Sequence, residues 1–491
     1  MAGPGTLSDE PLSPAGRLFI QPKTEVVIHC ILRGKNAIDI DAVKANVKSS
    51  LMWKHPRFCS LLVRDENGFE HWRRTQLDID QHVIVFNNRL DKSGKFMDGS
   101  ENQGFSIEQE EDSDDDEMAV NQYVADLSVS TPLNTDKPFW EIHLLMAHKC
   151  FVFRIHHALG DGISLMSMLM ASCRKASDEN ALPMMVPEKT GESMGDKRRS
   201  LFWLLGALWR FLKMALFTLV FLIEFLARIY LARDRKTVIS GGDGVELWPR
   251  KLATARFLLK DMKEVKKAIP NTTINDVLFG VVSSGLSRYL DHRTPNVQCL
   301  LLALHEGLRM TGVAMVNLRS KPGLLKISKL TKDNSEARWG NRFGVILLPV
   351  FYDKAGNDPL KYLKRAKTMV DRKKNSLEAY FSYRIGDLVM TLLGSKYACL
   401  LNHRLLCNTT FTISNMIGPL EEITLAGNPI SSIKVNTSSL PQAITMHMLS
   451  YADKAEMQIL VAKDIIPDPE FLAKCFEDAL LEMKMAAIGG Q

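Results

Sequence analysis

The stretch "FVFRIHHALGDGISL" (residues 151–165) decides how the whole chain is interpreted. An apolar run ends in His156 and His157, and after three further residues come Asp161 and Gly162. The run predicts a buried strand, and the glycine allows a tight turn after it. Adjacent strand residues point to opposite faces, so the two imidazoles cannot easily bind one metal ion. We therefore expect no metal here, and a histidine pair that is either structural or catalytic.

Length and composition predict a globular protein of two domains. The chain has 491 residues, of which 46% are hydrophobic and 24% charged. A chain of this length is longer than those that usually fold around a single hydrophobic core. The net charge of +6 is modest, and no nucleic-acid-binding motif is recognisable, which argues against a nucleic-acid partner. The eight cysteines form no C-x-x-C pair, so we expect reduced, mostly buried thiols in a cytosol-facing protein. The first residues show no signal-peptide pattern.

Residues 1–178 are predicted to form an N-terminal α/β domain that carries the histidine pair. Hydrophobic periodicity predicts four strands and one helix, namely strands at 26–32, 82–87, 140–146 and 150–156 and a helix at 38–53. An acidic tract at 108–117 is interpreted as a solvated loop. Polar and breaker residues at 179–200 predict a linker.

Residues 234–491 are predicted to form a second α/β domain of similar content. Strands are expected at 252–259, 313–318, 344–352 and 409–414, and helices at 274–290, 358–374 and 468–485. Thr273 is the expected N-cap of the first of these helices. The other two helices each have a proline in the first turn, where it is tolerated.

Between the domains, residues 201–233 form an apolar segment that predicts a membrane-associated helix. Its uncharged core, 214–223, is shorter than the roughly 20 residues needed to span a bilayer. At 100° per residue the nearby charges fall within an arc of about 60°, and these are Arg199, Arg210, Lys213, Glu224 and Arg228. A single polar stripe favours a helix that lies in the membrane interface. A single span and a buried interdomain helix are the alternatives.

The motif H-H-x-x-x-D-G resembles the signature of the coenzyme A-dependent acyltransferase superfamily. Further segments occur in the order seen in plant-type wax ester synthase/diacylglycerol acyltransferases: "PLSPAGRLF" (11–19), "KPFWEIHLL" (137–145), "TINDVL" (273–278), "VNLR" (316–319), "GNRFG" (340–344) and "SNMIGP" (414–419). The resemblance covers about 11–485. It implies a two-domain α/β fold like that of chloramphenicol acetyltransferase, with mixed sheets, flanking helices and an active-site tunnel between the domains.

The resemblance also assigns roles around the motif. His157 is the expected general base, because an imidazole with a pKa near 6.5 is neutral at pH 7 and can accept the alcohol proton. No nucleophilic serine or cysteine is needed, so we expect direct transfer without an acyl-enzyme. His156 would face the other side of the strand and support the loop. Asp161 would pair with an arginine, for which Arg319 is the candidate, and Gly162 would permit the turn.

Several other residues are expected at the site. Asn275 is a candidate donor to the developing oxyanion, with helix capping as an equal alternative. Capping is the stronger expectation for Asp276. The expected substrate-binding residues are Pro138, Phe139, Trp140, Asp276, Ser414 and Asn415. The family's P-L-W is P-F-W in this chain, which bears on the fit of the acyl chain.

The resemblance implies a membrane-associated O-acyltransferase. It would move a fatty acyl group from acyl-CoA, which is a substrate and not a cofactor, to a long-chain fatty alcohol, with diacylglycerol as the second acceptor. Membrane lipid would be contacted through 201–232, and we expect the endoplasmic reticulum membrane with a cytosol-facing site, or the plasma membrane as well. One alternative is a soluble BAHD-type acyltransferase of small metabolites, but the D-F-G-W-G motif of that family is absent from this chain. A second is a peptide-synthetase condensation domain, which would need carrier modules. The third is a catalytically silent lipid-binding protein.

Overall fold

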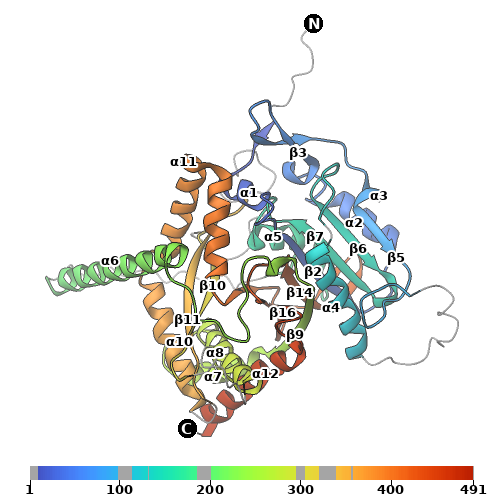
Figure 1. Ribbon diagram of the computed structural model, residues 1–491. Coiled ribbons are helices and arrows are strands. Elements are labelled where there is room, and N and C mark those ends of the chain that lie inside the picture. The colour runs from blue at the N-terminus through green and yellow to red at the C-terminus, as the bar shows by residue number, and fades with distance from the viewer. Residues whose placement is uncertain are drawn as a thin grey trace.

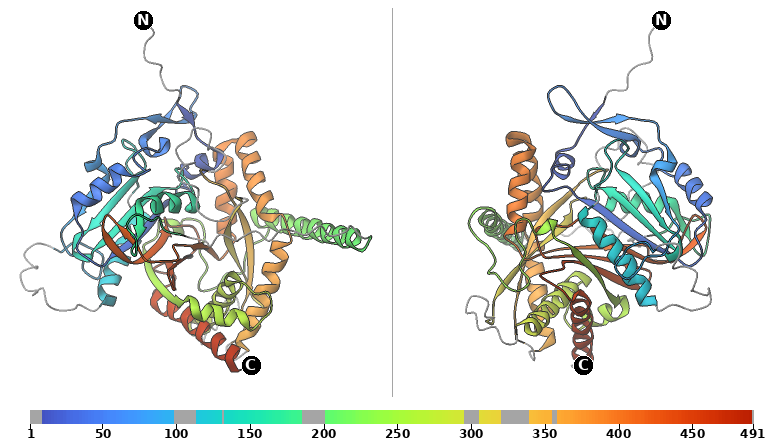
Figure 2. Two further views of the ribbon diagram at one scale, coloured as in Figure 1. Left: turned by 180° about the vertical axis from the view of Figure 1, so that it is seen from behind. Right: turned by 45° about the vertical axis from the view of Figure 1, so that its right-hand side comes forward.

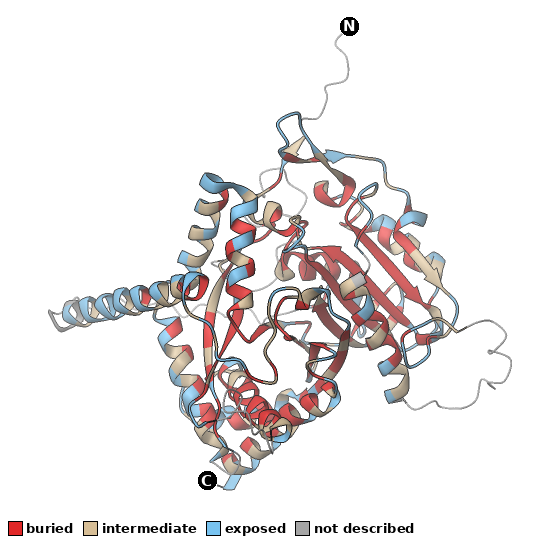
Figure 3. Cartoon of the chain, viewed as in Figure 1, coloured by how far each residue is buried: buried red, intermediate tan, exposed pale blue. Residues whose placement is uncertain are grey.

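Two mixed β-sheets with helices packed around them make up the fold (Figures 1 and 2). The computed structural model describes residues 9–97, 113–130, 132–184, 201–294, 305–319, 339–354 and 358–489. Each sheet has its own hydrophobic core, and the buried strands stand out in Figure 3. The predicted two-domain α/β architecture is confirmed in this part of the chain.

The first sheet has seven strands and contains the histidine pair. Its order is β5 (Val83–Phe86), β6 (Trp140–Leu145), β7 (Cys150–His156), β2 (Val27–Gly34), β14 (Asn428–Thr437), β13 (Ile423–Leu425) and β8 (Cys173–Lys175). The apolar runs in β7 and β2 are almost wholly buried, as their composition predicts. β13 and β14 come from the C-terminal half of the chain, and β14 pairs antiparallel with β2. The first sheet therefore takes strands from both halves.

The second sheet has six strands, all from the C-terminal half. Its order is β11 (Phe343–Phe351), β10 (Arg309–Asn317), β12 (Phe411–Ile417), β15 (Ile444–Tyr451), β16 (Lys454–Ala462) and β9 (Arg250–Leu258). A small sheet of β1 (Glu10–Pro11), β4 (Glu70–Arg74) and β3 (Ser60–Arg64) lies at the N-terminal end. β14 also contacts β15 and β16, so the two large sheets meet along it.

The described helices are α1 (Pro14–Phe19), α2 (Ile40–Ser49), α3 (Ile79–His82), α4 (Ser113–Ser130), α5 (Gly162–Ser172), α6 (Leu201–Tyr230), α7 (Leu259–Lys267), α8 (Ile274–Arg293), α10 (Pro359–Lys374), α11 (Glu378–Cys407) and α12 (Pro469–Gly489). Short 3₁₀ turns occur at η1 (Pro56–Cys59), η3 (Met146–His148) and η4 (Val245–Leu247). The predicted helices α2, α8, α10 and α12 are confirmed, including the cap of α8 by Thr273. The helices that were not predicted are α1, α3, α4, α5, α7 and α11.

The end of the acidic tract is helical, and here the prediction of a solvated loop is wrong. Residues 108–112 lie outside the described residues, but Ser113 begins α4. Asp116 lies 2.5 Å from Nδ1 of His148, and Glu117 lies 2.8 Å from Lys434 of β14. These carboxylates stabilise the start of α4 and fasten it to the first sheet. Of the predicted linker, residues 185–200 lie outside the described part.

α6 projects from the body of the protein, as Figure 1 shows. Its C-terminal half packs through polar side chains: Arg228 is buried and lies 2.7 Å from Asp234, and Glu224 pairs with Arg309. Its outer part is exposed, with Leu208 and Leu216 each more than half accessible. The alternative of a buried interdomain helix is therefore wrong. Among the described residues, none of the helices has both the length and the apolar character required to cross a bilayer.

Candidate active site

The histidine motif lies at a cavity whose walls come from both halves of the chain. The cavity has a volume of about 400 Å³. His157, directly after β7, lines it together with residues of α1, α5, α6, α11, β10, β11, β12, β14 and β15. Most of these lining residues are apolar. His157 precedes α6 in sequence, while Ser414 and Asn415 follow it, so segments on both sides of α6 in the sequence reach one cavity.

The two histidines have different environments, as alternation along the strand predicts. His156 is buried, and its Nδ1 accepts a hydrogen bond from the backbone N–H of Ala158 at 3.1 Å. Its ring lies 4.9 Å from that of Phe139 in the core. Because Nδ1 accepts, Nε2 carries the proton, and burial lowers the pKa of His156 to about 3. His156 therefore stays neutral and supports the loop, as expected.

His157 is held between two aromatic rings at the wall of the cavity. The centroid of Phe19, at the end of α1, lies 4.1 Å from the imidazole centroid, and that of Phe343 lies 5.8 Å away. Nδ1 is enclosed by protein, which leaves Nε2 to face the cavity. Burial lowers the pKa of His157 below its usual 6.5, and the charge of Asp161 partly offsets this shift. A neutral imidazole at pH 7 can accept a proton.

Asp161 holds the loop through the expected arginine. Both terminal nitrogens of Arg319 donate to its carboxylate, at 2.6 and 3.0 Å, so the predicted pair is confirmed. Asp161 also caps α5, because its Oδ1 accepts from the N–H of Ser164 at 3.0 Å. Charge-assisted, bidentate contacts of this kind fix geometry. The role of Asp161 is to position the loop; it does not hydrogen-bond His157.

The segment 340–344 clamps the same loop, a role that the sequence alone did not reveal. Asn341 donates from Nδ2 to the carbonyl oxygen of His157 at 2.9 Å, and the N–H of Arg342 donates to Asp161 at 3.0 Å. Gly340, with φ of 100°, presents its carbonyl oxygen to Arg319 at 2.7 Å. A side chain would strain this left-handed turn.

Gly162 is required by a close approach from the second sheet. A Cβ at this position would lie 2.7 Å from Sδ of Met416, which lines the cavity. The absence of a side chain therefore lets β12 approach the start of α5. This gives a physical reason for the glycine that ends the motif.

β12 and β15 supply the polar part of the opposite wall. Ser414 and Asn415, which were expected at the substrate, both line the cavity, and they belong to β12. Ser414 lies beside His447 of the parallel strand β15. His447 also lines the cavity, and burial together with nearby His157 lowers its pKa to about 4. No sequence pattern marks His447, because it lies alone in an ordinary strand pattern.

Asn275 and Asp276 lie at the start of α8, outside the cavity lining. Oδ1 of Asn275 accepts a hydrogen bond from Nδ2 of Asn415 at 2.6 Å, so its contact with the cavity is indirect. Asp276 is fully buried and closes a capping box with Thr273, whose backbone N–H donates to Oδ2 at 2.6 Å. Capping therefore explains Asp276, and its expected contact with substrate is not supported.

Pro138, Phe139 and Trp140 are core residues, which corrects their expected place at the substrate. None of them lines the cavity, and all three are buried. The indole N–H of Trp140 donates to the carbonyl oxygen of Phe58 at 2.9 Å. Its ring stacks on His82 at 4.0 Å. Aromatic side chains of this size contribute most where they are fully packed.

α11 forms much of the cavity wall, and this too was missed. Its lining residues include Met390, Leu401 and Leu405. Apolar side chains occur on all sides of this helix, so its periodicity is weak, and Gly394 interrupts it with φ of 82°. Gly344 allows α11 to contact β11, since a Cβ there would lie 1.8 Å from the carbonyl oxygen of Ala379.

Two family descriptions match the chain. Residues 117–278 match the wax ester synthase/diacylglycerol acyltransferase catalytic domain, and residues 339–484 match the WS/DGAT C-terminal domain. Wax ester synthase/diacylglycerol acyltransferase 11 of Arabidopsis thaliana is 33% identical, over 98% of this chain and 96% of its own. Wax ester synthase/diacylglycerol acyltransferase 5 of the same plant is 34% identical to this chain, over 97% of this chain and 94% of its own length.

Solved structures share the fold at low identity. The wax ester synthase/diacylglycerol acyltransferase of Marinobacter aquaeolei VT8 has a TM-score of 0.55 and 17% identity, over 97% of this chain and 99% of its own. The trichothecene 15-O-acetyltransferase of Fusarium sporotrichioides has a TM-score of 0.56 and 12% identity, over 97% of this chain and 95% of its own. Together with the family matches along the chain and the cavity at His157, these likenesses show that this acyltransferase belongs to the wax ester synthase/diacylglycerol acyltransferase family.

Proposed function

We propose that the protein transfers a fatty acyl group from acyl-CoA to a long-chain fatty alcohol, with diacylglycerol as a second acceptor. The observation that carries this proposal is the neutral, partly enclosed imidazole of His157 in a cavity lined mainly by apolar side chains. Such a lining suits alkyl chains and excludes water that would hydrolyse the thioester. The names of the plant relatives support both acceptors. Nothing in these comparisons favours a BAHD-type metabolite acyltransferase.

The chemistry proceeds in one displacement. Nε2 of His157 accepts the proton of the alcohol as its oxygen attacks the thioester carbonyl carbon. The carbon–sulfur bond breaks, and coenzyme A leaves as a thiol after taking that proton. Asn415 lines the cavity and is held by Asn275, so we assign Asn275 a positioning role in place of a direct oxyanion contact. His156 and Asp161 keep the loop in place.

The exposed faces of α6 and α11 suit attachment to a membrane surface. The two helices pack together beside the cavity, which Phe225 and Ile229 of α6 line. Their accessible apolar side chains include Leu212, Leu216, Leu219, Leu388, Leu392 and Leu393. Exposed apolar side chains of this kind, on helices next to a cavity for lipids, would let the acceptor enter from the bilayer. We propose the cytosolic face of the endoplasmic reticulum as this surface.

Activity is tested on the purified full chain with labelled acyl-CoA and either hexadecanol or diacylglycerol, followed by separation of the neutral lipids. The wild type should form wax ester, and His157→Ala should lower the rate by about 10²- to 10⁴-fold, the usual contribution of a general base. His305→Ala, at an exposed histidine, is the matched control. Wild-type rates in a folded His157→Ala variant would refute the assignment and favour a lipid-binding protein with silent motif residues.

Membrane attachment is tested by flotation with phosphatidylcholine vesicles. Replacing Leu212 and Leu216 by serine should reduce the bound fraction, because it removes apolar surface from α6. Replacing Leu481 and Met485 of α12, which are exposed to a similar degree, should leave the bound fraction unchanged. Equal loss in both double variants would show that α6 has no special part in binding.

A further inference from the structure

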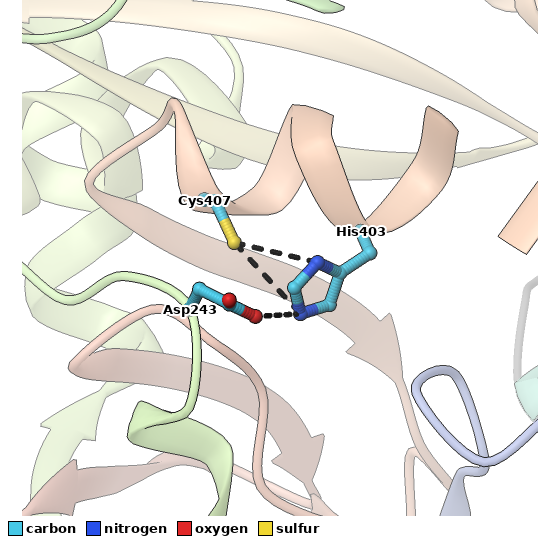
Figure 4. A group of neighbouring side chains, drawn as sticks. All are labelled: Asp243, His403 and Cys407. Atoms are coloured by element: carbon cyan, nitrogen blue, oxygen red, sulfur yellow. Dashed lines mark hydrogen bonds and ion pairs between the residues drawn. The ribbon is translucent and has the colours of Figure 1, made fainter. Parts of the chain in front are cut away.

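Metal-binding side chains gather on a face of α11 that does not line the cavity. Among the described residues, Asp243, His403 and Cys407 each offer one donor atom, and these atoms lie within 4.8 Å of one another. Figure 4 shows the three side chains pointing toward one another, Asp243 from a loop and the other two from α11. The proposed acyl transfer uses none of them, so the cluster calls for an explanation of its own.

Local structure brings these residue types together. His403 and Cys407 are four residues apart in α11, so they project from the same side of the helix. The facing loop carries Asp243 and, at η4, Glu246. Gly244 between them has φ of 86°, a conformation that glycine adopts at no cost. The result is an H-x-x-x-C pair opposite a D-x-x-E pair.

The donor atoms of Asp243, His403 and Cys407 lie close enough together for one ion to bind all three after small side-chain rotations. From Nε2 of His403, the nearest carboxylate oxygen of Asp243 is 3.4 Å away, and that of Glu246 is 3.3 Å away. Sγ of Cys407 is 3.8 Å from the same nitrogen and 3.6 Å from Nδ1 of His403. Metal–ligand bonds of about 2.0–2.3 Å give tetrahedral edges of roughly 3.3–3.8 Å. The two carboxylates are already at such a distance from Nε2, and a rotation of the Cys407 side chain would be needed to place Sγ in front of that nitrogen.

The electrostatics favour a cation at this point. Oε2 of Glu246 is buried and has no hydrogen-bond partner, which is costly for a carboxylate. The carboxylates of Asp243 and Glu246 lie 3.4 and 3.3 Å from the His403 imidazole, so this point attracts positive charge. Lys23 also contacts Asp243, at 3.1 Å, but both side chains are more than half exposed. An exposed pair of this kind is weak and can separate.

We infer that Asp243, Glu246, His403 and Cys407 form a zinc site that fastens α11 to the loop at 243–246. One sulfur, one nitrogen and two oxygen donors suit a borderline ion such as Zn²⁺. The neighbouring residues Leu401, Asn402, Leu405 and Leu406 line the cavity. The ion would therefore stabilise one wall of the cavity from behind. This inference does not depend on the acceptor of the acyl group.

The test uses the purified full chain, stripped with a chelator and titrated with Zn²⁺ against a chromophoric competitor. The wild type should bind one tight equivalent, and its unfolding temperature should rise with zinc. Cys407→Ser and His403→Gln should each weaken binding by at least about tenfold, since even outer-shell changes have effects of that size. Co²⁺ should give a thiolate charge-transfer band in the wild type that Cys407→Ser abolishes.

The matched control is Cys399→Ser, which removes another thiol of α11, one that lies outside the cluster and contacts Thr24. This variant should bind zinc like the wild type. The inference is overturned if the stripped wild type takes up no more zinc than Cys407→Ser. It is equally overturned if Cys399→Ser loses as much affinity, because zinc would then bind cysteines in general. In either case the four residues form only an ion-pair cluster.

Discussion

Arg319 and Asp161 are 158 positions apart, and yet two hydrogen bonds of 2.6 and 3.0 Å join them beside the base. Asp161 belongs to the first half of the chain and Arg319 to the second. Both side chains are more than nine-tenths buried. Their contact connects the assembly of the two domains to the position of the histidine loop.

Replacing Asp161 by asparagine should destabilise the fold strongly. Asparagine can still cap α5, but the buried guanidinium of Arg319 loses its charge partner, which costs about 3–5 kcal/mol. Chemical denaturation monitored by tryptophan fluorescence measures the change. Glu422→Gln is the control, because Glu422 pairs with Lys35 where both side chains are about half exposed, and it should cost less than about 1 kcal/mol. Equal effects would contradict the special role of the buried pair.

The pH dependence of the activity should show an acid limb below pH 6.5. Burial lowers the pKa of His157 from its usual 6.5, so the base stays neutral as the pH falls to that value and is protonated only below it. The measurement is kcat/KM against pH, with fluorescence as the check of folding. A limb centred above pH 6.5 would show that another group controls the rate.

His447→Gln should leave the onset of that acid limb unchanged. The pKa of His447 is about 4, so this side chain is neutral just below pH 6.5, and replacing it removes no charge there. Because His447 lines the cavity, the substitution should act on KM. A shift of the limb in this variant would instead identify His447 as the titrating base.

Gly162→Ala should narrow the cavity. The new Cβ would lie 2.7 Å from Sδ of Met416, and the flexible methionine would move to relieve the overlap, at a cost of about 1–3 kcal/mol. The expected result is a higher KM for long acyl-CoA. Met416→Ala in the same chain should restore KM, and a double-mutant cycle measures this coupling. Additive effects would mean that the two residues do not compete for space.

Gly344→Ala should displace α11 and lower both stability and activity. The Cβ would lie 1.8 Å from the carbonyl oxygen of Ala379, a backbone atom that cannot rotate away. Thermal unfolding and the acyl-transfer rate measure the damage. For thermal unfolding, Gly386→Ala is the control within α11, since a Cβ there meets no atom within 4 Å. This control should be neutral or stabilising by about 0.5–1 kcal/mol, and a loss equal to that of Gly344→Ala would contradict the close-approach explanation.

The sequence was most informative where local pattern and motif coincide. The apolar run before His157 predicted β7, and Thr273 with Asp276 predicted the start of α8. The pairing of Asp161 with Arg319 came from family resemblance, because nothing local connects residues so far apart. The same limit explains the error at Pro138, Phe139 and Trp140: a motif does not show whether an aromatic side chain faces a core or a cavity.

The features that the sequence did not reveal depend on tertiary contacts. α11 lacks a clear apolar stripe because it contacts the cavity, α6 and β11 on different sides. His447 is important only because β15 lies beside β12. β14 belongs to the first sheet because it pairs with β2, and no local sequence pattern predicts this pairing. Each of these follows from packing between distant segments.

The ribosome makes β14 long after β2, and this delay has a consequence during protein synthesis. His29 of β2 and its hydrogen-bond partner Asn436 are 407 positions apart. At 5–20 residues per second, the ribosome would need about 20–80 s to make the intervening chain. Throughout that interval one long, apolar edge of β2 would stay unpaired, and such an edge can join other chains. A nascent chain of this protein should therefore depend on chaperones until its last strands emerge, and its N-terminal half, expressed alone, should aggregate.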